Sequence, residues 1–226
     1  MRITKFGHSC VRLSHDGSDV VIDPGGWSET EALDGIAAVL VTHEHADHWT
    51  IDQLRATDAP VFTIAAVAEQ VREADPAVAE RVTVVTPGQE LDVAGFAVRV
   101  VGEKHAVIHP ELKHFDNSGY VVSAGGESVY HPGDSFERPG QDVDVFLGPA
   151  CAPWARMSEL IDLARDVAAP RTLAIHDKVY TDLGLGIVDF QMGNFLEKVG
   201  GTWHRLTPGS DPVSYTHLTL PTTERV

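Results

Sequence analysis

The sequence predicts one globular domain of the α/β class. The chain has 226 residues, of which 43% are hydrophobic and 22% charged, a balance that suits one well-buried core. Its first half consists mainly of short β-branched runs separated by clusters rich in Gly, Pro, Asn and Asp, which are typical of strands and turns. In its second half such runs alternate with segments of helical periodicity. Periodicity alone therefore indicates an α/β fold and no particular architecture.

The first half is expected to be mostly extended. Asp16-Gly17-Ser18 has the composition of a hairpin turn between two short strands. Ala65–Ala74 is predicted to be a helix, because Val67, Val71 and several alanines are spaced along it. The predicted strands cover residues 3–6, 10–13, 20–22, 37–41, 61–64, 82–85, 96–101, 120–123 and 128–131.

The second half is expected to add helices to the sheet. We predict strands over 143–147, 172–175 and 202–206, with helices over 158–167 and 186–199. Gly200-Gly201 would end the last helix. A single domain is thus predicted over residues 1–206. The tail, residues 207–226, is rich in Thr, Ser and Pro and is predicted to be disordered or a translated read-through end, outside the functional part.

The segment after the fourth predicted strand carries the strongest chemical signal. An apolar run is followed within a few residues by His43, His45, Asp47 and His48. In extended chain, residues two apart point to the same side, about 7 Å from each other. His43 and His45 can therefore approach one metal ion together, while Asp47 and His48 follow the bend and can face a second ion. A polar loop with merely solvated histidines is disfavoured, because three histidines and a carboxylate are interleaved.

The residues around this segment indicate a loop that leads into a helix. Thr50 and Gln53 have the spacing of a capping box, so a helix is expected to begin directly after Thr50. A zinc-protease motif is excluded, since it needs His-Glu-x-x-His on a helix. Here His43-Glu44 is followed by Asp47 where the second histidine should stand.

His43-Glu44-His45-Ala46-Asp47-His48 resembles the His-x-His-x-Asp-His signature of the metallo-β-lactamase-fold hydrolases. The resemblance covers residues 1–206 and implies a four-layer αββα sandwich. Gly7-His8-Ser9-Cys10 and Ile22-Asp23-Pro24 are most similar to the branch that includes L-ascorbate-6-phosphate lactonase and phospholipase-D-like enzymes. The chain is therefore expected to be a metal-dependent hydrolase.

The resemblance also implies a set of metal ligands at the ends of several strands. One ion would be held by His43, His45 and His105, a second by Asp47, His48 and His176, and both would be bridged by Asp134. Within the predicted loop after residue 101, His105 follows the apolar strand directly, and we expect it to be the ligand. His109 is the main alternative, and His114 lies in a charged run.

The implied chemistry is hydrolysis by a metal-activated hydroxide. Two neighbouring divalent ions lower the pKa of a shared water, and Asp47 could orient the resulting nucleophile while Asp134 joins the ions. Asp47 and Asp134 are thus the predicted catalytic residues. Zinc suits the imidazole and carboxylate ligands best, and manganese or iron is compatible with them. The expected substrate is a small soluble ester, lactone or phosphodiester.

Two alternative functions would use the same metal site without hydrolysis. An iron-dependent oxidoreductase can use the same fold, although its flavodiiron branch usually carries Glu where His45 stands and has a flavin domain. A non-catalytic metal-binding module would need one of the ligands to be missing, yet the sequence offers a candidate for each position.

Charge and composition limit the expected partners. Lys and Arg number 17 against 33 Asp and Glu, so the net charge is −16, which disfavours nucleic acid and anionic membranes. The N-terminus lacks an apolar signal core, and no apolar run reaches membrane-spanning length, so a cytoplasmic location is expected. Cys10 and Cys151 are interpreted as small buried residues rather than a disulfide. The sequence does not predict the oligomeric state.

Several other polar and aromatic residues have competing interpretations. His8 could line the site, but a structural role is favoured. Asp23 could equally orient a ligand histidine or cap a turn. Asn117 is interpreted as a turn former, and His131 could face either the core or the pocket. Trp154 could line a substrate cleft or pack in the core.

Overall fold

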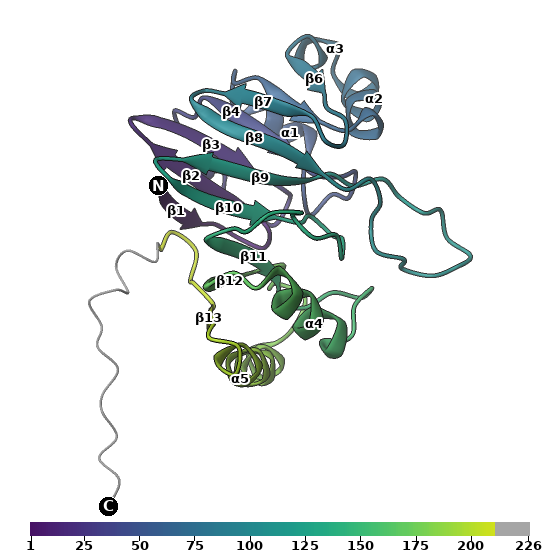
Figure 1. The fold of residues 1–226 in the computed structure, drawn as a ribbon. Helices are drawn as coiled ribbons and strands as arrows, with labels where there is room; N and C mark the ends of the chain where they lie inside the picture. Colours follow the sequence, from purple (N-terminus) through teal and green to yellow (C-terminus); the bar gives the residue numbers. More distant parts are fainter. Residues whose placement is uncertain (211–226) are drawn as a thin grey trace, which may run out of the picture.

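Two β-sheets lie face to face at the centre of the molecule, with helices on their outer sides (Figure 1). The computed structural model describes residues 1–210, and the rest of the predicted tail lies outside the described residues. The first sheet has six strands within the described chain, ordered β1 (Arg2–Lys5), β2 (Val11–His15), β3 (Ser18–Ile22), β4 (Ala38–Val41), β5 (Val61–Thr63) and β6 (Val82–Val84). Strands β1 to β3 form an antiparallel meander, and β3 to β6 are parallel.

The second sheet repeats this plan in the other half of the chain. Its described strands are β7 (Glu90–Val93), β8 (Phe96–Val101), β9 (Gly119–Ala124), β10 (Glu127–His131), β11 (Val145–Pro149), β12 (Arg171–Ile175) and β13 (Thr202–His204). Strands β7 to β10 are antiparallel neighbours, and β10 to β13 are parallel. Each half therefore contains a meander followed by parallel strands.

Alternating apolar side chains explain why the sheets are covered on both faces. Leu40 of β4 belongs to the core between the sheets, whereas Val39 and Val41 pack on the outer side under the helices. Leu147 and Phe146 of β11 divide in the same way between the inner and outer cores. Strands buried on both faces need a layer on each side. The predicted four-layer αββα sandwich is thus confirmed.

Helices supply the two outer layers. The first sheet is covered by η1 (Thr30–Leu33), α1 (Ile51–Arg55), α2 (Ala65–Ala74) and α3 (Pro76–Ala79), and the second by α4 (Met157–Val167) and α5 (Asp182–Glu197). Thr50 caps α1 by accepting a hydrogen bond from the Gln53 amide, so this helix begins where the sequence predicts. In the described part of the chain, we find no helix with the length and apolarity to cross a membrane.

Some boundaries differ from the sequence predictions. The last helix begins at Asp182 rather than residue 186, because the Thr181 hydroxyl caps the Gly184 amide. Strand β7 and helix α3 were not predicted, since both are short and β7 alternates with exposed acidic residues at the sheet edge. The domain boundary at residue 206 stays a prediction. Backbone hydrogen bonds join Gly209 and Ser210 to Lys5 of β1.

Candidate metal centre

The ends of β3 and β4 are tied together by a buried carboxylate. Asp23 follows β3 and accepts hydrogen bonds from the Thr42 amide at 2.8 Å and the Thr42 hydroxyl at 2.7 Å. The same carboxylate lies 2.7 Å from Nδ1 of His48. Asp23 therefore orients His48 of the loop after β4, residues 43–48, which we call the His-rich loop. The backbone of Asp23 is left-handed, with φ of 52°.

The first group of candidate ligands contains His43, His45, His105 and Asp134. Their potential ligand atoms all lie within 4.8 Å of one another. Nε2 of His43 is 3.0 Å from Nδ1 of His45, and Nε2 of His105 is 3.4 Å from Oδ2 of Asp134. Nδ1 of His105 lies 2.5 Å from the Ala106 carbonyl oxygen, which can only accept. Nδ1 therefore carries the proton, and Nε2 offers its lone pair to the group.

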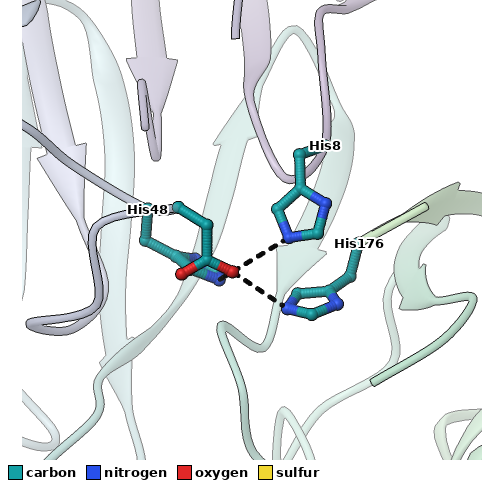
Figure 2. Close-up of side chains that lie close together, drawn as sticks. His8, His48 and His176 are labelled. Atoms are coloured by element: carbon teal, nitrogen blue, oxygen red, sulfur yellow. Dashed lines mark hydrogen bonds and ion pairs between the residues drawn. The ribbon is translucent and has the colours of Figure 1, made fainter. Parts of the chain in front are cut away.

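The second group contains His8, Asp47, His48 and His176, again within 4.8 Å of one another. Figure 2 shows the three histidines approaching from separate segments of the chain. Oδ2 of Asp47 lies 3.1 Å from Nε2 of His8 and 3.5 Å from Nε2 of His176. Nδ1 of His176 lies 2.5 Å from the Cys151 carbonyl oxygen, so Nδ1 carries a proton and Nε2 is the nitrogen that faces the group.

Asp134 connects the two groups. Its Oδ1 lies 3.2 Å from Nε2 of His48, while its Oδ2 lies 3.2 Å from Nε2 of His176. The Trp154 indole N–H donates a hydrogen bond to Oδ2 of Asp134 at 2.8 Å. The backbone amide of Asp134 donates to Oδ1 of Asn117 at 3.0 Å. Trp154 and Asn117 thus both support Asp134, in addition to any packing or turn role.

The loop between β8 and β9 places only one of its three histidines in the groups. His105 is buried at the end of β8, whereas His109 is exposed and accepts a hydrogen bond from the Glu111 amide at 3.2 Å. His114 lies 2.7 Å from the His105 carbonyl oxygen through its Nε2 and therefore supports the loop. The geometry agrees with the expectation that favours His105 over His109.

Burial and nearby charges shift the pKa values of the site residues in opposite directions. Burial and the neighbouring imidazoles lower the pKa of His43 well below its ordinary value, against the pull of Asp134. For His48, burial also disfavours the charged form, but Asp134 and Asp23 outweigh it and raise its pKa to about 10. The pKa of Asp134 stays well below its ordinary value because His176 and His48 offset the cost of burial. The site therefore attracts positive charge.

Orphaned polar atoms test whether these residues fit a metal. Nε2 of His48, His105 and His176 and Oδ1 of Asp134 are buried, and none has a hydrogen-bond partner among the described residues. Such atoms are costly in a folded protein unless a ligand satisfies them. All four lie toward the other candidate ligands, and neutral imidazole with carboxylate is a donor set that divalent metals accept. The residues therefore fit a divalent metal centre.

The structure brings together all seven predicted site residues, which come from the ends of β4, β8, β10 and β12. Sequence reasoning gave His8 as a possible lining residue but favoured a structural role, and it missed the contact of Trp154 with Asp134. A signal existed for Trp154, because a buried indole N–H needs an acceptor. His131 belongs to neither group, since its Nε2 lies 3.0 Å from the Ser9 carbonyl oxygen. Cys10 and Cys151 are both buried free thiols, as predicted.

Comparisons with known proteins agree with this fold. Residues 2–176 match the family model described as the beta-lactamase superfamily domain. Protein Rv0786c of Mycobacterium tuberculosis is 37% identical over 196 residues, which cover 83% of this chain and 89% of the relative. A metal-dependent hydrolase of Methanopyrus kandleri is 32% identical over 158 residues, or 65% of this chain and 66% of the relative. The chain therefore belongs to the beta-lactamase superfamily, as a metal-dependent hydrolase with the metallo-β-lactamase fold.

Solved structures support the same architecture at low sequence identity. Igni18, a metallo hydrolase from Ignicoccus hospitalis, superposes with a TM-score of 0.72 at 20% identity, covering 93% of this chain and 96% of the other. The diiron beta-hydroxylase CmlA from Streptomyces venezuelae gives a TM-score of 0.69 at 16% identity, covering 93% of this chain and 53% of the other. At these identities the likeness shows the fold alone.

Proposed function

We propose that this protein hydrolyses an ester, lactone or phosphodiester bond of a small molecule at a centre of two divalent metal ions. The observation that carries the proposal is the set of four buried ligand atoms on His48, His105, Asp134 and His176 that form no hydrogen bond with the described residues. A lactone is included because the opening motifs resemble the lactonase-like and phospholipase-D-like branch. The net charge of −16 supports a small-molecule substrate rather than nucleic acid.

The two groups divide the proposed ligands. In the proposal, His43, His45 and His105 would hold one ion, Asp47, His48 and His176 would hold the other, and Asp134, which lies near ligand atoms of both sets, would serve both. Zinc is the expected metal, because histidine nitrogen and carboxylate oxygen are its usual ligands in hydrolases. Manganese and iron accept the same donors, so metal analysis must decide among them.

Bound divalent ions would supply Lewis acidity, which lowers the pKa of a water and polarises the bond under attack. The protein's own residues would accept the proton and shield the site from solvent. Asp47 is partly exposed, with one-fifth of its side chain accessible, and in the proposal it receives the proton of the attacking water. Asp134 is buried, and the Trp154 indole covers it from behind, which excludes solvent from one oxygen of the carboxylate.

The oxidoreductase alternative has less support. Its flavodiiron form is expected to carry Glu in place of His45, and this chain places the His45 ring beside those of His43 and His105. Bound iron together with redox activity in the purified protein would favour this alternative. A non-catalytic module would instead bind metal and leave every tested bond intact.

The proposed function is tested with bis-p-nitrophenyl phosphate and a panel of lactones and esters, before and after metal removal. We expect hydrolysis that disappears with a chelator and returns with zinc. His105→Ala should lose one ion and roughly a hundredfold or more in rate, since a direct ligand matters at least as much as its supporting residues. His109→Ala is the matched control from the same loop and should retain both. Chelator-insensitive activity, or the opposite ranking, would refute the assignment.

A further inference from the structure

His8 holds an unusual position at the second group of candidate ligands. It is fully buried in the turn between β1 and β2, and its backbone is left-handed with φ of 59°. His176 is left-handed as well, with φ of 54°, and its amide donates to the His8 carbonyl oxygen at 3.1 Å. Such conformations are costly outside glycine and persist where surrounding contacts enforce them. The main chain of His8 therefore fixes the loop that carries His176.

The preceding residue explains why this turn can approach so closely. A Cβ atom on Gly7 would lie 2.2 Å from the Trp27 carbonyl oxygen, so only glycine fits. The Trp27 ring in turn packs edge-on against His8, with 4.7 Å between ring centroids. The imidazole of His8 is thus held in one orientation.

Hydrogen bonds define which nitrogen of His8 carries the proton. Nδ1 lies 3.3 Å from the Lys178 backbone amide, which can only donate, so Nδ1 is the acceptor. In a neutral ring the proton must then be on Nε2, which lies 3.1 Å from Oδ2 of Asp47. A protonated nitrogen has no lone pair for a metal.

We propose that His8 is a positioning residue that donates a hydrogen bond from Nε2 to Oδ2 of Asp47, and that it is not itself a metal ligand. The ion pairs and hydrogen bonds of Asp47 with described residues all involve Oδ2. The His8 contact therefore leaves Oδ1 of Asp47 available to an ion or to a water. This inference rests on the proposed function, because it assigns the roles within the same metal centre.

The test is a zinc titration of the full chain after chelator treatment, read by competition with a chromophoric chelator and by cobalt absorption. Asp47→Ala identifies the binding step that belongs to the second group. His8→Leu should weaken that step about 10- to 100-fold, as expected for loss of a residue that orients a ligand. His8→Gln should retain most of the affinity, because the Gln amide can donate in place of Nε2–H.

A double-mutant cycle separates positioning from a general structural role. If His8 acts through Asp47, His8→Leu should cause no further loss in the Asp47→Ala background. A further loss there, an equal loss in His8→Gln and His8→Leu, or an unchanged affinity in His8→Leu would each overturn the inference. Zinc binding by the first group shows in every variant whether the protein is folded. If His8→Leu does not fold, the zinc affinity of His8→Gln alone decides the test. Wild-type protein that binds no zinc would instead refute the proposed function.

Discussion

At the scale of single residues, Asp134 is the side chain on which both groups of candidate ligands depend. Its two oxygens lie 3.2 Å from the histidines at 48 and 176, which come from loops far apart in the sequence. The carboxylate is almost fully buried, and Trp154 and Asn117 fix both its head and its backbone. A carboxylate held this firmly in a buried site is expected to serve a bound cation rather than solvent.

Asp134→Ala should therefore lower the metal content below two ions per chain and reduce hydrolysis by more than the roughly 10- to 100-fold typical of an outer-shell partner. Metal analysis and the ester assay on the same preparation measure both effects. Asp142→Ala removes an exposed carboxylate eight residues further on and serves as the matched control. Full metal content with an unchanged rate would remove Asp134 from the centre.

At the scale of elements, the ends of parallel strands place the site. Asp23 after β3 joins Thr42 and His48 after β4, so the pairing of these two strands sets the position of the His-rich loop. The hydrogen bond to Nδ1 directs Nε2 of His48 toward Asp134. The strand ends thus serve as a rigid support for the candidate ligands.

Asp23→Ala should lower zinc affinity about 10- to 100-fold and also reduce stability, because the buried Thr42 amide would lose its acceptor at a cost of about 1–3 kcal/mol. Zinc titration and chemical unfolding measure these effects. Asp19→Ala lies near the start of the same strand, where its ion pair with Arg12 is partly exposed. This control should change neither zinc affinity nor stability appreciably. Equal effects of the two variants would contradict the role of Asp23.

The elements also show what the sequence could predict. Most strands and the start of α1 follow from apolar patterning and capping, which are local properties. Strand β7 was missed because it is only four residues long, so its alternation of exposed acidic and apolar residues is too short a pattern to mark a strand. The loop of His43 to His48 was found because several candidate ligands are adjacent in sequence, whereas His105, Asp134 and His176 followed only from the family resemblance. The contact of His8 with Asp47 was not predicted, because the two residues are 39 positions apart and only the fold brings them together.

At the scale of the whole molecule, protons and the proposed metal ions would compete for the same centre. Burial lowers the pKa of His48, but Asp134 and Asp23 raise it to about 10, above the value of about 6.5 expected in the unfolded chain. Its bound proton therefore stabilises the metal-free fold fully below pH 6.5, and this contribution is lost as the pH rises toward 10. Zinc must displace that proton in order to bind Nε2.

The rise in Tm on adding zinc should consequently be larger at pH 8.5 than at pH 6.5. Thermal unfolding of chelator-treated protein, with free zinc held constant by a metal buffer, measures this difference. In His48→Gln the pH dependence should be weaker, since the proton that zinc displaces is absent. A gain in Tm that is constant or decreases with rising pH would show that protons do not occupy the proposed ligands.

The repeated meander-and-parallel plan of the two sheets has a mechanical consequence. The first sheet carries His43 and His45 of one group, while the second carries His105 and Asp134 of the same group. The other group is likewise assembled from both sides of the seam, with His176 as the contribution of the second sheet. Ions bound there would link the two halves of the sandwich, so that metal binding would stabilise the packing of one sheet against the other.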